Sequence, residues 1–402
     1  MTTRSRSERN ALGAAGAMPT ASPVRRLVYL SPTYHPYRVP VFDALHRMVG
    51  DGFVVVTLRT QPTRNDRLAQ QLGSFPKRTI RGRYLWLSRH HDAGRQSQTS
   101  LVLAPGLAAA LRRQRPEAVI ANNFSVWTLT SLLLGYPTVL FWEGTPHTER
   151  TVRPSRLALR RWMARRARAF VVNGTLATQY LVETVGAPPD RIVAGGLVPE
   201  PPPARFAGSA PRRLQPGEPV RFLFVGRLVA GKGVASLLRA AALLDEQLGA
   251  GATFTVELVG DGPERAALER QAAEAGIRHR VRFAGYAPPD AVWDHYAASH
   301  VFVLPTLQDT WALVVPEAMW MGLPVLVSKY AGSAPDLVRE GVNGHIFDPE
   351  DPAELARLMA SYVATPRRIE EHGRESVRLV APYTPENAAR AYLQAVRLAV
   401  RP

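Results

Sequence analysis

The stretch RFLFVGRLVAGKGVASLLRAA, residues 221–241, decides the fold of this chain more directly than any other segment. Residues 222–225 form a short apolar run that is typical of a buried parallel strand. Gly226 ends this run, and the helical spacing of apolar residues begins at Val234. A strand that breaks at glycine and restarts as a helix leaves N–H groups unpaired at the positive end of a helix dipole. Such a turn favours binding of an anion.

The turn between this strand and this helix also carries two cations, Arg227 and Lys232. They stand among three glycines, at positions 226, 231 and 233. One guanidinium and one ammonium beside free backbone amides make a phosphate or diphosphate the expected ligand. The alternative interpretation is a surface loop that happens to be basic.

The composition is that of a globular protein with a large excess of positive charge. The chain has 402 residues and a formal net charge of +17, and it contains no cysteine. Disulfides and thiolate chemistry are therefore excluded, which fits a cytoplasmic location. No apolar run reaches the roughly 18 residues of a membrane span. Nucleic acid is not an expected partner, because no basic platform interleaved with aromatic residues is present.

Apolar runs and helical patterns alternate along both halves, which predicts parallel sheets covered by helices on both faces. Strands are expected at 26–31, 53–58, 118–121, 138–142, 169–172, 221–225, 253–259, 281–284, 301–304 and 324–327. Helices are expected at 41–48, 101–113, 156–168, 176–185, 234–244, 263–275, 290–298, 313–321, 336–340, 354–364 and 383–400. Residues 60–100 show too little periodicity for a helix or strand to be assigned.

Composition shifts divide the chain into a tail, two α/β domains, a linker and a closing helix. Residues 1–22 read as a disordered tail rather than a signal peptide, because their apolar part is short and rich in alanine and glycine. Residues 199–219 contain seven prolines and read as a linker. The domains are then residues 23–198 and 220–380, and residues 381–402 hold the closing helix. Ligands of such open sheets lie beyond the carboxyl ends of the strands, which predicts a ligand cleft between the two domains.

Two further strand ends in the second half carry glycines. Gly260 lies in LVGDGP, and Gly285 precedes Tyr286 in RFAGY. A glycine at a strand end allows the backbone to approach a ligand closely, and the aromatic ring could lie near a nucleotide base. Ordinary turn glycines are the alternative for both.

The segment LPTLQDTWALVVPEAM, residues 304–319, contains two acids eight residues apart, Asp309 and Glu317. The helix here must begin shortly before Pro316, because proline is tolerated only in the first helical turn. The free amides ahead of Pro316 therefore predict a second anion site. Carboxylates beside anion-binding groups make sense as acceptors for the hydroxyls of a sugar or ribose. Capping of the helix dipole is the alternative.

The pieces GRLVAGKG, LVGDGPE, RFAGY and DTWALVVPEAMWMGLPVLVS resemble, in this order, the retaining GT-B-fold glycosyltransferases of family four. The similarity covers residues of about 220–360. It implies two Rossmann-like, doubly wound domains that face a cleft, with the closing helix crossing back onto the first domain. It also implies a nucleotide-diphosphate sugar as donor substrate and a hydroxyl group as acceptor, on a lipid-linked molecule or a growing glycan.

This resemblance assigns roles to individual residues. Arg227 and Lys232 would hold the donor diphosphate, and Glu317 would bind the nucleotide ribose. Asp309 takes the place of the first acid in the family's Glu-x7-Glu pattern, so it would contact the donor sugar. Arg227, Lys232 and Asp309 are thus the expected catalytic residues. The other residues expected around the donor are Gly226, Gly260, Gly285, Tyr286, Ala312, Leu313 and Val314.

The mechanism implied by the resemblance is glycosyl transfer with retention, with no metal and no cofactor. No Asp-x-Asp metal motif occurs, so cations of the protein can replace Mg²⁺. Two other enzyme classes remain as alternatives. One is a nucleotide-sugar epimerase of the same fold. The other is a P-loop NTPase or kinase, although Gly233 stands where that motif has the serine or threonine that binds magnesium.

The first half departs from the family's pattern. The family's glycine pair after the first strand is replaced by residues 34–38, and Glu143 stands where the family often has a histidine. By position alone, the candidates for acceptor contacts are His35, Arg38, Glu143 and His147. A surface or core role is an equal alternative for each.

Residues 153–168 carry seven arginines, with Leu159, Trp162 and Met163 among them. A basic amphipathic helix of this kind can rest on anionic lipid. The sequence therefore suggests an enzyme that docks peripherally on the inner face of the membrane. A solvated helix that turns its apolar residues inward is the alternative.

Overall fold

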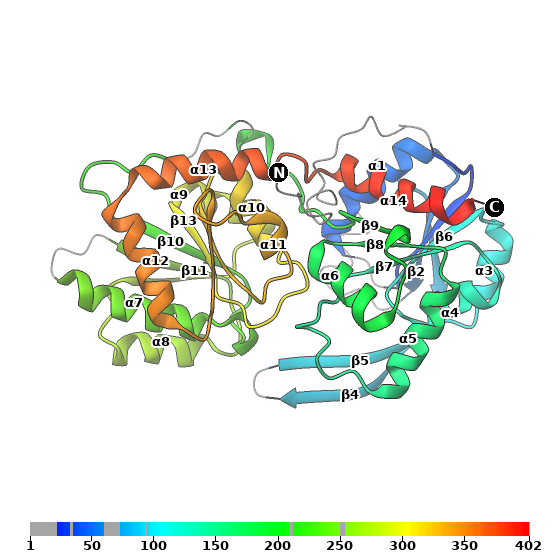
Figure 1. Ribbon diagram of the computed structural model, residues 1–402, viewed down its shortest axis with the longest axis horizontal. Coiled ribbons are helices and arrows are strands. Elements are labelled where there is room, and N and C mark those ends of the chain that lie inside the picture. Colours follow the sequence, from blue (N-terminus) through cyan, green and yellow to red (C-terminus); the bar gives the residue numbers. More distant parts are fainter. Residues whose placement is uncertain are drawn as a thin grey trace, which may run out of the picture. The chain divides into compact units, whose positions relative to one another are not determined.

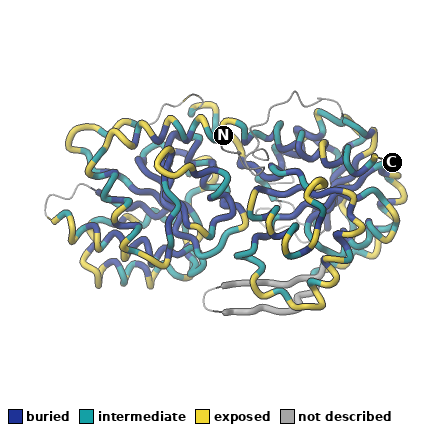
Figure 2. The backbone as a smooth tube through the Cα atoms, viewed as in Figure 1, coloured by how far each residue is buried: buried dark blue, intermediate teal, exposed yellow. Residues whose placement is uncertain are grey.

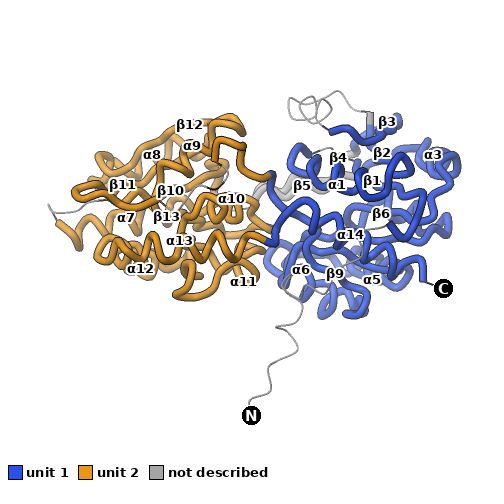
Figure 3. The backbone as a smooth tube through the Cα atoms, turned by 90° about the horizontal axis from the view of Figure 1, so that it is seen from above, with its two compact units in different colours: residues 1–90, 96–200, 382–402 blue, residues 91–95, 201–381 orange. Residues whose placement is uncertain are grey.

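The computed structural model describes residues 22–32, 35–59, 73–92, 95–206, 208, 212–249 and 254–401. It divides into two compact units (Figure 3). Unit 1 contains residues 1–90, 96–200 and 382–402, and unit 2 contains residues 91–95 and 201–381. The predicted disordered tail lies outside the described residues except for Ser22.

Unit 1 is built on a seven-stranded parallel sheet in the order β3-β2-β1-β6-β7-β8-β9 (Figure 1). Its strands are β1 (Leu27–Leu30), β2 (Phe53–Arg59), β3 (Lys77–Arg81), β6 (Ala118–Asn122), β7 (Thr138–Trp142), β8 (Ala169–Val172) and β9 (Ile192–Ala194). Leu27 of β1 pairs with Phe53 on one side and with Ala118 on the other. Two further strands, β4 (Arg83–Asp92) and β5 (Arg95–Leu103), form a separate two-stranded sheet.

The helices of unit 1 include the last helix of the chain. They are α1 (Val39–Val49), α3 (Leu107–Gln114), α4 (Val126–Leu133), α5 (Pro154–Arg166), α6 (Thr175–Gln179), which continues as a π-helical segment (Tyr180–Val185), and α14 (Pro385–Val400). Helix α14 packs against α1, β8 and β9. Its buried Tyr392 hydroxyl lies 3.3 Å from the hydroxyl of Tyr29, which donates a 2.8 Å hydrogen bond to Asn122. Residues from both ends of the sequence thus share one core.

Unit 2 has a six-stranded parallel sheet in the order β12-β11-β10-β13-β14-β15. Its strands are β10 (Val220–Val225), β11 (Phe254–Val259), β12 (Val281–Gly285), β13 (Val301–Leu304), β14 (Val325–Ser328) and β15 (Gly344–Phe347). Its helices are α7 (Val234–Leu248), α8 (Arg265–Glu274), α9 (Pro289–Ala298), α10 (Val314–Trp320), α11 (Ala334–Leu337), α12 (Pro352–Ala364) and α13 (Arg367–Val380). In Figure 1, α7, α8 and α12 lie on one side of this sheet, and α9, α10 and α13 lie on the other.

The inner strands are almost entirely buried, as expected for a parallel sheet between two layers of helices (Figure 2). All residues of β1, β6, β7, β8, β13 and β14 are buried. The strand order reverses between β1 and β6 in unit 1 and between β10 and β13 in unit 2. Open α/β sheets bind ligands at such reversal points, beyond the carboxyl ends of the strands. In unit 2, this position holds the loops that follow β10 and β13.

Several predicted elements need correction. The helix predicted over 101–113 is wrong in its first part, because residues 101–103 end β5 and the helix starts at Leu107. The helix predicted over 336–340 lies earlier, at Ala334–Leu337. The prediction omitted β3, β4, β5, β9, β15, α4 and α13.

His300 lies just before β13 and anchors the base of the unit 2 sheet. Its side chain is fully buried, and its Nδ1 accepts a 3.0 Å hydrogen bond from the backbone N–H of Arg221. Burial lowers the pKa of His300 from 6.5 to about 4, although the Glu218 carboxylate, 3.6 Å from Nε2, acts in the opposite direction.

This lowered pKa predicts a loss of stability at acidic pH. In the unfolded chain His300 is protonated below about pH 6.5, whereas in the folded chain it is protonated only below about pH 4. The free energy of unfolding therefore falls as the pH is lowered from 6.5 to 4. Between pH 7 and pH 5 the residue should cost about 2 kcal/mol of unfolding free energy. His300→Asn retains an acceptor for the Arg221 amide and should remove this part of the pH dependence in urea unfolding. If the free energy of unfolding depends on pH equally in the wild type and in His300→Asn, the lowered pKa of His300 is not the cause.

Candidate functional site

Three loops at the carboxyl edge of the unit 2 sheet are joined through their backbones. Gly226, which follows β10, donates a 3.0 Å hydrogen bond to Val259 O, and Leu228 donates one of 3.0 Å to Asp261 O. The loops approach so closely that a Cβ atom on Gly260 would lie 1.9 Å from the carbonyl oxygen of Gly226. Gly260 in turn donates a 2.7 Å hydrogen bond to Gly285 O, at the end of β12. The glycines predicted around the donor therefore allow these strand ends to come together.

Gly233, the last glycine of the β10 loop, permits the contact with the loop after β13. It has φ +66°, and a Cβ atom there would lie 2.0 Å from the carbonyl oxygen of Pro305. The neighbouring Gly231 O accepts hydrogen bonds from Leu307 N (2.9 Å) and from Thr306 Oγ1 (3.1 Å). No side chain fits at position 233, so the serine or threonine of a P-loop NTPase has no room in this turn.

The most direct contact between the predicted site residues is an ion pair. Lys232 Nζ lies 2.5 Å from Asp309 Oδ2, and their side chains are 26% and 14% exposed. The other carboxylate oxygen, Oδ1, accepts hydrogen bonds from the amides of Trp311 (3.2 Å) and Ala312 (2.9 Å). Ala312 has φ +64°, a left-handed conformation that is unfavourable for alanine. The carboxylate of Asp309 thus gathers a cation and two backbone amides.

The backbone around Asp309 is fixed from the opposite side. The Asp309 N–H donates a 3.2 Å hydrogen bond to Tyr330 O, and Asp309 O accepts one of 3.1 Å from Gly332. A Cβ atom on Gly332 would lie 1.9 Å from the carbonyl oxygen of Thr310. The loop that carries Asp309 is therefore packed against the loop after β14.

Glu317 lies in the first turn of α10 and is held by a tyrosine that the sequence analysis did not select. The hydroxyl of Tyr296, in α9, donates a 2.9 Å hydrogen bond to Glu317 Oε2. Burial, and then the Glu317 carboxylate, raise the pKa of Tyr296 well above its usual value. The hydroxyl therefore stays protonated and remains a donor to Glu317.

The remaining residues predicted to bind the donor substrate lie in or next to these loops but take less part in the contacts between them. Arg227 is exposed, and its guanidinium forms no ion pair with any residue that the structure describes. Tyr286, which follows β12, is 63% exposed. Leu313 and Val314 lie where α10 begins. The structure thus brings Lys232, Asp309 and the Ala312 amide into contact and leaves Arg227 and Tyr286 at the surface.

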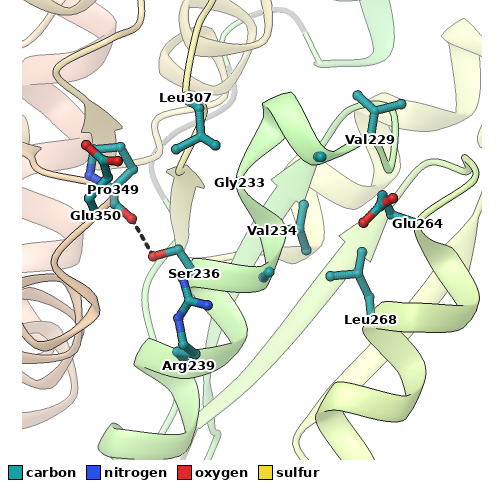
Figure 4. Close-up of a pocket in the computed structure, with 12 residues that line it drawn as sticks. Val229, Gly233, Val234, Ser236, Arg239, Glu264, Leu268, Leu307, Pro349 and Glu350 are labelled. Carbon is teal, nitrogen blue, oxygen red and sulfur yellow. Dashed lines mark hydrogen bonds between the residues drawn. The ribbon is translucent and has the colours of Figure 1, made fainter. Parts of the chain in front are cut away.

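A pocket of about 320 Å³ borders the β10 loop (Figure 4). Its wall includes Val229 and Gly233 from the loop, Glu264 from the start of α8, and Glu350. Ser236 Oγ closes one side by donating a 2.6 Å hydrogen bond to Pro349 O, shown dashed in Figure 4. Neither Lys232 nor the two predicted acids line this pocket, so it is a neighbour of the predicted donor site rather than the site itself.

In unit 1, two of the four acceptor candidates are in contact. Arg38 Nη2 lies 3.0 Å from Glu143 Oε1, and both side chains are largely buried. Burial alone would lower the pKa of the Arg38 guanidinium, but the Glu143 carboxylate raises it above its ordinary value. The ring of His35 stacks on that of Tyr37, with centroids 5.1 Å apart. His147 Nδ1 lies 3.1 Å from an Arg150 nitrogen.

Sequence reasoning missed Tyr296 and the direct contact between Lys232 and Asp309. Tyr296 follows Trp293 at helical spacing, which signals an apolar helix face and says nothing of a polar role for the hydroxyl. The ion pair joins residues 77 positions apart, a contact that no local pattern encodes.

Comparison with known proteins supports one family for both halves. Residues 210–376 match the family described as glycosyl transferases group 1, and residues 38–195 match the glycosyl transferase 4-like domain. The 2-deoxystreptamine glucosyltransferase of Streptomyces kanamyceticus is 31% identical over 298 residues, which are 67% of this chain and 74% of that protein. The D-inositol 3-phosphate glycosyltransferase of Thermomonospora curvata is 33% identical over 226 residues, 52% of each chain. The chain thus spans about half the length of this relative.

Solved structures share the fold at low sequence identity. Alr3699/HepE of Anabaena in complex with UDP superposes with a TM-score of 0.71 at 18% identity, over 92% of this chain and 99% of that one. The lipopolysaccharide outer core galactosyltransferase WaaB gives a TM-score of 0.70 at 12% identity over the same shares. With both sheets doubly wound and both halves matched, this chain belongs to the GT-B-fold glycosyltransferases of family four.

Proposed function

We propose that this chain transfers a glycosyl group, with retention, from a nucleotide-diphosphate sugar to a hydroxyl acceptor. The observation that carries the proposal is the cluster of Lys232, Asp309 and the Ala312 amide, at the reversal point of the unit 2 sheet. A cation and a backbone amide suit a diphosphate, and a carboxylate suits the hydroxyls of a sugar. The UDP named with the Anabaena structure makes a uridine nucleotide the first donor to test.

In this reaction the bond from the sugar's anomeric carbon to the diphosphate oxygen breaks through an oxocarbenium-like state. Lys232 and Arg227 stabilise the leaving diphosphate as its negative charge grows. The acceptor hydroxyl forms the new bond on the same face of the sugar, and its proton passes to a diphosphate oxygen. Glu317, oriented by Tyr296, accepts hydrogen bonds from the ribose hydroxyls.

The acceptor is proposed to be a polyhydroxylated molecule, either free or lipid-linked. Two relatives are named for acceptors with a hydroxylated ring, D-inositol 3-phosphate and 2-deoxystreptamine. The Arg38–Glu143 pair in unit 1 supplies both hydrogen-bond donors and an acceptor for such a molecule. An acceptor panel should therefore include inositol phosphates, aminocyclitols and lipid-linked sugars.

We also propose that α5 docks the enzyme on anionic lipid. No described helix is both long and apolar enough to cross a membrane. Six of the seven arginines in residues 153–168 are exposed, as is Leu159 (47%), and this segment contains no acidic residue. The seventh, Arg160, is buried and paired with Glu149 at 2.7 Å, so it does not contribute to the surface.

Loss of either cation of the β10 loop should lower turnover. Lys232→Ala and Arg227→Ala should each reduce kcat at least about 10²-fold, as expected when a group that stabilises transition-state charge is removed. Arg280→Ala is the control, because Arg280 pairs with Asp245 at 2.9 Å and lies just before β12, at the edge of the sheet opposite the β10 loop. Radiolabelled sugar transfer with a panel of nucleotide sugars provides the measurement.

Near-normal rates for both loop variants would refute the proposed site. Isomerised sugar nucleotides formed without any acceptor would instead identify an epimerase. Nuclear magnetic resonance of the anomeric proton in the product tests retention.

Tyr296→Phe should weaken nucleotide binding through Glu317. Removing the hydroxyl deletes one hydrogen bond to a carboxylate, which corresponds to about 1.5–3 kcal/mol before compensation by water. We expect Kd for UDP to rise about tenfold, and Kd for a ribose-deoxygenated UDP analogue to change little. In the Glu317→Gln background the same substitution should have almost no effect. An equal effect of Tyr296→Phe in both backgrounds would show that the tyrosine does not act through Glu317.

Neutralising the end of α5 should weaken binding to anionic vesicles. Arg165 and Arg166 lie in the last turn of α5, and Arg112 and Arg113 lie in the last turn of α3. We expect the double glutamine variant in α5 to weaken binding to phosphatidylglycerol vesicles about 30-fold, because two charges at roughly 1 kcal/mol each amount to about 2 kcal/mol. The matched double variant in α3 should bind as the wild type does. Equal, negligible binding to anionic and neutral vesicles would remove this proposal.

A further inference from the structure

The carboxylate of Asp309 occupies the middle of a small anion-binding cluster. It accepts from the Lys232 ammonium at 2.5 Å, from the Ala312 amide at 2.9 Å and from the Trp311 amide at 3.2 Å. A charged donor and converging backbone amides are also what a donor diphosphate requires. The protein's own carboxylate therefore uses hydrogen-bond donors that the proposed substrate needs.

Asp309 and a diphosphate cannot both be fully satisfied by this cluster. A backbone amide has a single proton, so Ala312 can donate well to only one of them. The Lys232 ammonium has three protons and could bridge both anions, but the carboxylate would then lie against a phosphate oxygen of like charge. Binding of a diphosphate thus either removes hydrogen bonds from Asp309 or brings two negative groups together.

The loop cannot relieve this conflict by moving aside. The Asp309 backbone is bonded to Tyr330 and Gly332, and Gly332 has no room for a Cβ atom. The backbone of Lys232 is equally confined, because the adjacent Gly233 packs against Pro305 O. Only side-chain rotation of Asp309 and Lys232 remains, and aspartate is too short to move its carboxylate far.

The conflict has a different outcome for the loaded donor, which is the nucleotide sugar, and for the spent donor, which is the nucleoside diphosphate left after transfer. A bound nucleotide sugar brings hydroxyl groups that can donate to Asp309 in exchange for the bonds it has lost. A nucleoside diphosphate brings no such donor, and its terminal phosphate carries a second ionisable oxygen with a pKa of about 6, hence more negative charge near neutral pH. A carboxylate left without partners in a largely buried position is costly.

We propose that Asp309 makes the site discriminate against the spent nucleoside diphosphate in favour of the loaded donor. This inference rests on the function proposed above and adds a specificity role to the residue expected to contact the sugar. After transfer, as the diphosphate leaves, Asp309 forms its ion pair with Lys232 and its hydrogen bonds with the backbone amides again. The same carboxylate that grips the sugar therefore also promotes release of the product.

The test compares affinities for UDP and for UDP-glucose by titration calorimetry. Asp309→Asn removes the negative charge and keeps the size of the side chain. We expect it to bind UDP about fivefold more tightly than the wild type, the size of a partly exposed ion pair. Its affinity for UDP-glucose should stay unchanged or fall, so that the preference for the loaded donor decreases. Product inhibition by UDP should strengthen by the same factor.

Asp245→Asn is the matched control. Asp245 pairs with Arg280 at 2.9 Å, with side chains 23% and 18% exposed, close to the exposures of the Asp309 pair. It lies near the end of α7, at the opposite edge of the sheet from the β10 loop. This variant should bind UDP and UDP-glucose as the wild type does. Asp309→Ser, which keeps a short hydrogen-bond acceptor without charge, replaces Asp309→Asn if melting shows that the first variant is unfolded.

The outcomes separate this inference from the proposed function. If UDP binds the wild type and binds the Asp309 variants equally or more weakly, the discrimination role is wrong and the glycosyltransferase assignment stands. If both the Asp309 variants and Asp245→Asn bind UDP more tightly, the effect is one of net charge and the role is also wrong. If the wild type binds neither UDP nor GDP, nor any sugar nucleotide of the panel, the proposed function fails and this inference fails with it.

Discussion

The close approach of two loop backbones, at Gly233 and Pro305, is the constraint on which the candidate site depends. This contact joins the loop after β10 to the loop after β13, and these are the two strands between which the order of the sheet reverses. Because the backbones meet, a lysine from one loop and an aspartate from the other reach the same point. Any side chain at position 233 would push the two loops apart, and this would also separate Lys232 from Asp309.

This constraint also explains why one half of the chain is easier to interpret from its sequence than the other. In unit 2, the strand–glycine–cation–helix pattern predicted β10 and the start of α7 to within one residue, because the apolar run ends at Gly226 and the helical spacing begins at Val234. In unit 1, Arg38 lies in the short helical turn directly before α1 and Glu143 follows β7, so these two residues meet only in the folded chain. Their pairing follows from the order of the sheet, which no local pattern contains.

The errors of secondary structure have similar physical causes. Residues 101–103 are apolar and fit a strand or the start of a helix equally well, since so short a run has no measurable period. Strands β9 and β15 are three and four residues long and lie at sheet edges, where only part of each strand is buried. Helix α13 separates its charged residues clearly from a buried face that includes Ile369, His372 and Val380, so its helical period was present in the sequence and the prediction missed it. The polar role of Tyr296 was not predicted, because it depends on a carboxylate that lies in another helix.

The position of α14 bears on how the polypeptide is made. This helix is encoded after the whole of unit 2, yet it belongs to unit 1 and buries Tyr392 beside Tyr29. During translation, unit 2 can finish folding as soon as residue 381 has left the ribosome. Unit 1 is synthesised first but must wait, with part of its sheet uncovered, until the end of α14 emerges. The unit that is synthesised first is therefore completed last, and part of its core stays exposed until then.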